Sequence, residues 1–260
     1  MKVTFDKNVY EFVVDPEKSA NINSSAREDY RKIHEAILKG KIIPFISETI
    51  VTYEVLKKDQ RQSILSHPQP ILVSGNEGTI SIFSNPGIHP GNSTYEDIYL
   101  PKAIGMGFKI LPDRRFGKLI NPHVKKEWYY VPDEDYFIRS DRYSEVLKLL
   151  EELNVGYIQF KNLINSNDLG HLPIFTAISL YAGSIKKLSA ALSERSDGDS
   201  VALHITYEID YFCTFDKGAN AGQSVFNDKI GNVLKERYLF EKVSPSDLAV
   251  LIDFSTSSLN

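Results

Sequence analysis

Apolar positions in the first part of the chain recur with two different periods. Residues 2–6 alternate between β-favouring apolar and polar side chains, which predicts a strand that ends near Asp6. An apolar stripe at helical spacing, preceded by a capping-box serine and followed by a glycine, predicts a helix over residues 26–39. The short apolar run at 42–46 predicts a second strand, and the serine that follows it is placed to cap a helix over residues 47–57.

The second half of the chain shows the same two periods. The patterns predict helices over residues 143–153 and 174–192, strands over 156–160, 209–214 and 239–243, a polar loop over 193–199, and a last helix from Pro245. Strands that alternate with helices are typical of an α/β fold. We therefore expect a mainly parallel central sheet flanked by helices.

Regular patterning is lost in the middle of the chain, where prolines cluster. Only short β-like pieces stand out there, at residues 71–73 and 79–83. A long structureless loop is unusual inside a compact domain. We therefore divide the chain into one domain, made of residues 1–58 and 140–260, and an insertion over residues 59–139 with short strands and loops.

Composition and charge narrow the class of protein. The 260 residues are 42% hydrophobic and 25% charged, and 30 basic residues against 34 acidic residues leave a net charge of −4. That balance predicts a folded chain with no global attraction to nucleic acid. The single cysteine excludes a disulfide framework and a cysteine-based zinc module. No signal core or membrane-length apolar segment is found, so we expect a cytoplasmic protein that does not contact the membrane.

Acidic residues at the ends of predicted strands are the first candidates for chemistry. Asp6 and Asp216 follow two such strands, and ligands of open α/β sheets bind at the carboxyl ends of strands. Glu54 falls on the apolar stripe of its predicted helix, where a carboxylate is costly unless it is paired or bound to a metal. Asp199 opens a predicted helix. The alternatives are turn or cap residues for the aspartates and a buried salt bridge for Glu54.

Several short blocks of the chain resemble, in the right order, the motifs of PIN-domain nucleases. The opening block resembles the family's D-x-N-V motif, the second its strand, serine and helix with an inward glutamate, the third its D-x-x-H helix start, and the fourth its strand and T-x-D motif. The blocks are residues 4–9 (TFDKNV), 46–56 (ISETIVTYEVL), 198–204 (GDSVALH) and 209–217 (IDYFCTFDK). Residues 243–248 (VSPSDL) are also similar to the chain end of many members.

This resemblance implies a three-layer PIN-like fold and a metal-dependent ribonuclease. The residues that it implies as catalytic groups and as ligands of Mg²⁺ or Mn²⁺ are Asp6, Glu54, Asp199 and Asp216. Hard divalent cations prefer such oxygen ligands. The implied reaction hydrolyses phosphodiester bonds and leaves a 5′-phosphate and a 3′-hydroxyl. Asn8 and Thr214 would orient the ligands or the attacking water, or they would only stabilise turns.

The segment 101–130 is the candidate surface for RNA. Its seven basic residues face only two acidic ones, and aromatic residues are interleaved with them. Basic side chains follow phosphates and aromatic rings stack on bases, although a solvated loop would show the same composition. The basic residues are Lys102, Lys109, Arg114, Arg115, Lys118, Lys125 and Lys126.

Three other functions fit the same residues. The chain could be a non-catalytic PIN-like module that binds nucleic acid or protein, a relative that cleaves DNA, or a toxin held inactive by an antitoxin. The sequence leaves open the RNA substrate, the number of metal ions and the oligomeric state.

Overall fold

A parallel β-sheet forms the centre of the molecule. The computed structural model describes residues 1–21, 24–56, 71–76, 79–84, 98–114, 121–172, 174–218 and 224–257. The central sheet has five parallel strands in the order β5-β2-β1-β6-β7. The predicted α/β class is therefore confirmed. The strands are β1 (Lys2–Phe5), β2 (Ile43–Ser47), β5 (Lys109–Leu111), β6 (Tyr211–Cys213) and β7 (Lys242–Val243).

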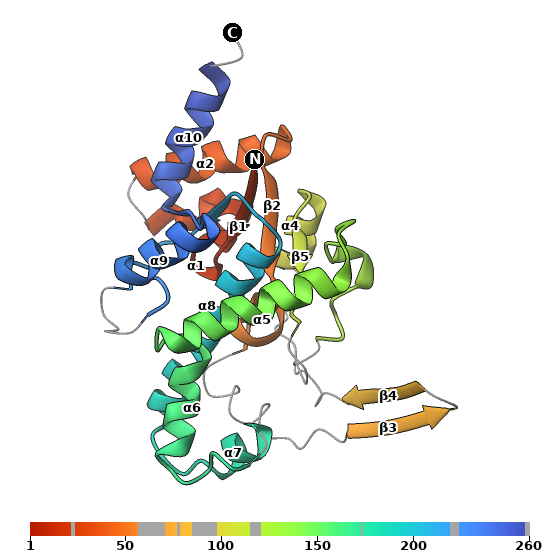
Figure 1. The fold of residues 1–260 in the computed structure, drawn as a ribbon. Helices are drawn as coiled ribbons and strands as arrows, with labels where there is room; N and C mark the ends of the chain where they lie inside the picture. Colours follow the sequence, from red (N-terminus) through yellow and green to blue (C-terminus); the bar gives the residue numbers. More distant parts are fainter. Residues whose placement is uncertain are drawn as a thin grey trace.

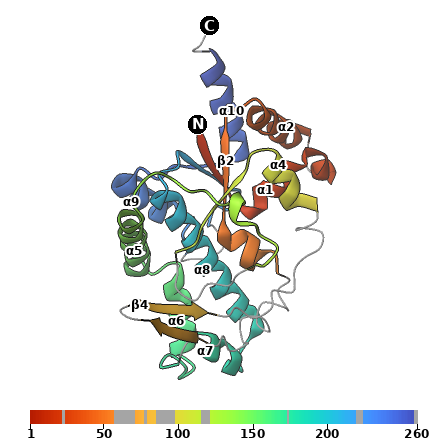
Figure 2. The same ribbon diagram turned by 90° about the vertical axis from the view of Figure 1, so that its right-hand side faces the viewer.

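Helices cover both faces of this sheet (Figures 1 and 2). One face packs against α1 (Lys7–Val14), α2 (Ser24–Leu38), α4 (Leu100–Gly105) and α10 (Pro245–Ser257), and the 3-10 helix η1 (Pro16–Asn21) contacts α1 and α2. The other packs against α5 (Tyr136–Glu152), α8 (Ile185–Thr206) and α9 (Asp228–Tyr238). Successive strand side chains point to opposite faces, so the neighbours Phe45 and Ile46 of β2 belong to different core clusters. The result is a three-layer arrangement.

A small helical lobe extends from one end of α8. It consists of α6 (Tyr157–Asn165), α7 (Ile174–Leu180) and the first half of α8, which share a cluster that includes Phe160, Ile178 and Leu188. The strand predicted over 156–160 is therefore wrong, because these apolar residues face neighbouring helices and not a sheet. The helix predicted over 174–192 is in fact two helices, and the Ser184 hydroxyl caps the second by accepting from Lys187 N.

The loop predicted over 193–199 is also wrong, because α8 continues through these residues to Thr206. Small and polar side chains are buried there by close neighbours. Gly198 packs so tightly on α6 that a Cβ atom at this position would lie 2.9 Å from Gly156 Cα. The Ser200 hydroxyl forms hydrogen bonds with Ser47 (2.7 Å) and Thr49 (2.9 Å). Tertiary contacts, not helix propensity, therefore stabilise this part of the helix.

Part of the predicted insertion belongs to the central domain. β5 is an edge strand of the main sheet, and Leu100 and Phe108 lie in the same core cluster as β1. The boundary predicted at residue 139 is therefore corrected for this portion. The two predicted short strands are confirmed as the antiparallel pair β3 (Ile71–Asn76) and β4 (Thr79–Ser84), which lies apart from the central sheet (Figure 1). In the part of the chain that the structure describes, no helix is long and apolar enough to cross a membrane.

Candidate functional site

The candidate site lies where the strand order of the sheet reverses. The chain forms β1 first and then adds β2 and β5 on one side of it. It later adds β6 and β7 on the other side of β1. Ligands of open α/β sheets bind at the carboxyl ends of the strands beside this switch point. Asp6 directly follows β1, and Asp216 lies shortly after β6, so both carboxylates start at the expected edge.

The Asp6 carboxylate is fixed by three hydrogen bonds. As the N-cap of α1, its Oδ1 accepts from the backbone N–H of Lys7 at 2.7 Å. Its Oδ2 accepts from Asn8 Nδ2 at 2.8 Å and from Thr214 Oγ1 at 2.6 Å. The predicted proximity of Asn8 and Thr214 to a site carboxylate is therefore present, and both side chains orient Asp6.

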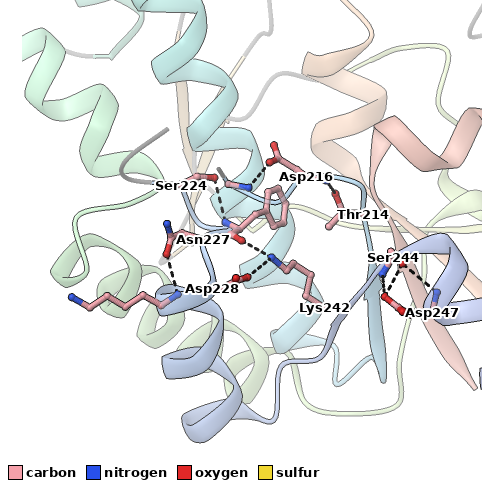
Figure 3. A network of polar contacts seen from close by, with 11 residues as sticks. Thr214, Asp216, Ser224, Asn227, Asp228, Lys242, Ser244 and Asp247 are labelled. Atoms are coloured by element: carbon pink, nitrogen blue, oxygen red, sulfur yellow. Dashed lines mark hydrogen bonds and ion pairs between the residues drawn. The ribbon is translucent and has the colours of Figure 1, made fainter. Parts of the chain in front are cut away.

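Thr214 also holds the turn that carries Asp216, and Figure 3 shows these two residues in contact. The backbone N–H of Asp216 donates to Thr214 Oγ1 at 3.0 Å, and its Oδ1 accepts from Gly218 N at 2.7 Å. The amide oxygen of Asn8 accepts from Phe215 N at 3.2 Å. The turns after β1 and β6 are thus joined by side-chain hydrogen bonds, and Asp216 itself is exposed to solvent.

Glu54 reaches the site from the segment after β2. This segment is a π-helix, η2 (Ile50–Glu54), and not the ordinary α-helix that the sequence predicted. Short π-helical turns are frequent at functional sites. Glu54 Oε1 accepts from Ser196 Oγ of α8 at 2.7 Å, and its backbone oxygen accepts from Lys7 Nζ.

Asp197 lines the same pocket as Asp6, Glu54 and Asp216, whereas the predicted Asp199 does not line it. A pocket of about 350 Å³ is lined by Asp6, Lys7, Asn8, Glu11, Phe12, Glu54, Asp197 and Asp216. Asp199 lies two positions further along α8, which is about 200° around a helix, and so it points elsewhere. It is buried, and its Oδ2 lies 3.7 Å from Arg195 Nε.

Asp199 is a site residue only by the resemblance of residues 198–204 to a D-x-x-H helix start, and no helix starts there. Once α8 is known to run through this region, helical spacing places Asp197 on the same face as Glu194, three residues earlier. Glu194 holds two backbone segments beside this part of α8. Its Oε1 accepts from Val225 N at 2.8 Å and from Gly156 N at 3.3 Å.

Crowding and burial disfavour negative charge in this pocket. Burial, and then the charges of Glu54 and Asp216, raise the pKa of Asp6 from 3.8 to about 7. Burial raises the pKa of Asp197 well above its ordinary value, and Glu54, Asp6, Glu194 and Asp216 add to this effect in that order. A cation would relieve this repulsion.

The donor set suits Mg²⁺ or Mn²⁺, because carboxylate oxygens are the ligands that these cations prefer. Among the described residues, however, no group of three or more acidic, histidine or cysteine side chains is already arranged to hold a metal. The pocket therefore offers suitable ligand chemistry, and its side chains would have to turn toward an ion.

Two other buried titratable residues, Glu48 and His204, stabilise the fold and do not line the pocket of Asp6. Glu48 is buried and accepts from Asp113 N at 2.6 Å and from Tyr129 OH at 2.7 Å, which fixes the β5 region to β2. His204 lies in the core between Phe212 and Phe240, and its Nδ1 is 3.0 Å from Thr4 Oγ1. Burial lowers its pKa to about 3, so it is neutral.

Four basic residues of segment 101–130, namely Lys102, Lys109, Arg114 and Lys125, each contact a different partner. Lys102 pairs with Asp15 at 3.8 Å, Lys109 Nζ donates to the Glu127 carbonyl, and Arg114 donates to the Tyr136 carbonyl and lies over its ring. Lys125 lies over the ring of Trp128, and Lys126 begins η4 (Lys126–Trp128). Arg115 and Lys118 lie outside the described residues. RNA binding by this segment stays a prediction.

Comparisons with protein-family models, with curated proteins and with solved structures find no match to this chain. The resemblance to PIN-domain nucleases therefore stays a prediction from the motifs.

Proposed function

We propose that this protein is a divalent-cation-dependent ribonuclease that hydrolyses phosphodiester bonds at the pocket of Asp6, Glu54, Asp197 and Asp216. One observation carries the proposal. Four segments that are distant in the chain bring these carboxylates to a single pocket, and that pocket lies at the switch point of a parallel sheet. A structural role alone does not require four like charges at this place.

The carboxylates of this chain would have different roles at such a site. Asp6 is held in one orientation by Asn8 and Thr214, so it is the best-ordered ligand for a cation. Glu54 and Asp197 would approach the same cation from η2 and α8, and Asp216 from the turn after β6. A bound Mg²⁺ or Mn²⁺ supplies positive charge for the phosphate and lowers the pKa of a bound water.

RNA is the proposed substrate because of the family resemblance and because of the basic and aromatic residues of segment 101–130. Arg114 and Lys125 of this segment each lie beside an aromatic ring, and proteins that bind single strands combine basic and aromatic side chains in this way. Single-stranded DNA is the alternative substrate, and the same assay distinguishes the two.

The test is a cleavage assay with the purified chain. A 5′-labelled single-stranded RNA and a DNA of the same sequence are incubated with Mg²⁺, with Mn²⁺ or with chelator. We expect cation-dependent cleavage of RNA that is abolished by Asp6→Asn. Lys39→Met, which removes an exposed charge just after the C-terminal end of α2, is the control and should leave cleavage unchanged. Cleavage that persists in chelator, or in Asp6→Asn, would contradict the proposal.

A non-catalytic module that binds nucleic acid or protein is the second candidate. It is favoured by one observation, namely that the described acidic residues are not already arranged around a metal position. This candidate predicts RNA or protein binding that is indifferent to Mg²⁺ and Mn²⁺, with no cleavage under either cation.

A further inference from the structure

A second pocket lies at the edge of the sheet opposite to the carboxylates. Its volume is about 740 Å³, which is in the range of pockets that hold small molecules. Its lining includes Met1, Asp210 and Glu241, which directly precede β1, β6 and β7. We call it the amino-edge pocket, because it lies at the amino ends of these strands. The rest of its lining comes from Arg142 and from segments 204–211 and 237–241.

A buried histidine offers one polar atom to the amino-edge pocket. His204 is 1% exposed and lines the pocket, and its ring packs against Phe212 and Phe240. Its Nδ1 lies 3.0 Å from Thr4 Oγ1, while its Nε2 has no hydrogen-bond partner among the described residues. Buried polar groups in folded proteins are nearly always hydrogen-bonded. Because Thr4 and the two rings hold the imidazole in place, Nε2 is a fixed point at which a ligand can be recognised.

Apolar side chains surround this nitrogen. Ile205, Ile209 and Phe240 line the pocket and are almost fully buried. Leu239 lines its outer part, is 82% exposed and has the left-handed φ of 59° at the end of α9. Glycine and asparagine are the usual residues at such a helix end, so the cap does not explain a leucine here. A ligand that covers Leu239 would remove its apolar surface from water, which is favourable.

The charged groups that line the amino-edge pocket favour one anionic group on the ligand. The acidic side chains of the lining already have partners, which are Arg142 for Glu208 (3.2 Å), Lys2 N for Asp210 (2.7 Å) and Lys235 for Glu241 (2.7 Å). Arg237 lies 3.7 Å from Glu145, and both side chains are more than half exposed. Exposed ion pairs of this kind contribute little to stability, so Arg237 can exchange Glu145 for an anion.

We propose that the amino-edge pocket binds a small aromatic molecule that carries a hydrogen-bonding group at one end and a carboxylate at the other. The hydrogen-bonding group pairs with His204 Nε2, and the carboxylate pairs with Arg237. The aromatic ring packs against Phe240 and Leu239, since aromatic and apolar side chains favour such contacts. This inference is independent of the proposed nuclease function, because the two pockets lie at opposite edges of the sheet.

A hollow filled by water is the simpler interpretation of this pocket, with a water molecule bound to Nε2. The two interpretations differ in what they predict. A hollow filled by water has no preference among small molecules and gives Leu239 and Arg237 no role in binding. A ligand site distinguishes molecules by their hydroxyl and carboxylate groups and loses affinity when Leu239 is changed.

The test follows the His204 ring by nuclear magnetic resonance in the full chain with isotope-labelled histidine. The Nε2 signal is assigned through the contacts of the ring with Phe212 and Phe240. The probe is para-hydroxyphenylacetate, whose phenol can donate to Nε2 or accept from it. We expect a saturable shift of this signal at millimolar concentrations of the probe. Phenylacetate, which lacks the hydroxyl, should bind about three- to tenfold more weakly. Para-hydroxyphenylacetamide, which lacks the charge, should bind about two- to fivefold more weakly.

Leu239→Asn is the matched variant, because asparagine tolerates the left-handed conformation and should leave the end of α9 intact. It should weaken binding of the probe on the order of tenfold, since an apolar contact is lost. Val131→Asn removes another strongly exposed apolar side chain that does not line the pocket. As the control, it should leave the affinity for the probe unchanged.

The outcomes decide between the two interpretations. No saturable shift of the Nε2 signal with any of the three compounds would overturn the proposal. Equal affinity for all three compounds, or equal affinity of the wild type and Leu239→Asn for the probe, would also overturn it. Any of these results would leave the nuclease proposal in place, which is tested by RNA cleavage and by substitutions at the opposite edge of the sheet.

Discussion

Thr214 Oγ1 donates a 2.6 Å hydrogen bond to Asp6 Oδ2, although the two residues are 208 positions apart in the chain. The same hydroxyl accepts from Asp216 N. One side chain thus fixes the carboxylate of Asp6 and the backbone of Asp216, and its removal should affect stability and the site together.

Thr214→Val removes this hydroxyl while keeping the shape of the side chain. We expect the free energy of unfolding to fall by about 1–3 kcal/mol, because buried polar partners lose their hydrogen bonds. The variant should also raise the pKa of Asp6 further, since the Thr214 hydrogen bond lowers it. Thermal denaturation measures the first effect. Thr214→Ser should retain most of the stability, and equal loss in both variants would contradict the role given to the hydroxyl.

Asp197 and Asp199 provide a matched pair of isosteric substitutions. Asp197→Asn should weaken Mn²⁺ binding by at least about tenfold, because a carboxylate of the pocket is lost. Asp199→Asn should leave Mn²⁺ affinity unchanged and only lower the melting temperature, because Asp199 interacts with Arg195 and does not line the pocket. If Mn²⁺ titration showed weaker binding in Asp199→Asn and unchanged binding in Asp197→Asn, Asp199 would be the site residue.

The raised pKa of Asp6 predicts an unusual dependence of stability on pH. Between about pH 4 and pH 7 the folded chain holds a proton on Asp6 that the unfolded chain has lost, so this group stabilises the fold less as pH rises. Relative to Asp6→Asn, the wild type should lose up to about 4 kcal/mol of unfolding free energy as the pH rises across that window. Added Mn²⁺ should reverse the shift at pH 8. A difference that does not vary with pH would contradict the assignment.

His204 should have the opposite effect on the pH dependence, because it makes the fold less stable as the pH falls. Its pKa is about 3 in the fold, so the unfolded chain gains a proton below pH 6.5 that the folded chain does not. Stability should fall by about 3 kcal/mol from pH 7 to pH 4 through this group. His204→Gln removes this dependence while it can keep a hydrogen bond to Thr4. Chemical denaturation at several pH values measures it, and a pH profile unchanged from the wild type would refute the prediction.

The contact between α6 and α8 can be tested with two Gly→Ala changes. Gly198→Ala places a Cβ atom 2.9 Å from Gly156 Cα, and the two backbones must separate. We expect a loss of about 1–3 kcal/mol of stability, together with weaker Mn²⁺ binding because Asp197 is the preceding residue. Gly231→Ala in α9 has no atom within 4 Å of the new Cβ, so it should stabilise the chain by about 0.5–1 kcal/mol. Equal effects at both positions would contradict this packing.

The elements that could be predicted from the sequence are those in which neighbouring residues show a clear pattern of apolar, polar and capping side chains. The strand that ends at Asp6 and the helix α2 follow from side-chain periodicity and capping residues, and both are present. The course of α8 could not be predicted, because Ser196, Gly198 and Ser200 are poor helix formers whose helical conformation is stabilised by buried contacts with other elements.

The same difference explains the outcome for the site. Asp6, Glu54 and Asp216 could be found because each lies near the carboxyl end of a strand or on an apolar stripe. Asp197 was missed because its position depends on the helix that local sequence obscured. The place of β5 in the central sheet was missed for a similar reason, since three residues in a proline-rich segment carry no clear strand pattern.

The pairing of β1 with β6 has a consequence for synthesis. Val3 lies opposite Tyr211, so the middle of the sheet closes only after more than two hundred residues have been translated. Until then Asp6 has neither its Thr214 partner nor Asp197 and Asp216 beside it. A partly translated chain on the ribosome therefore lacks the assembled pocket until the segment that carries Tyr211, Thr214 and Asp216 has emerged.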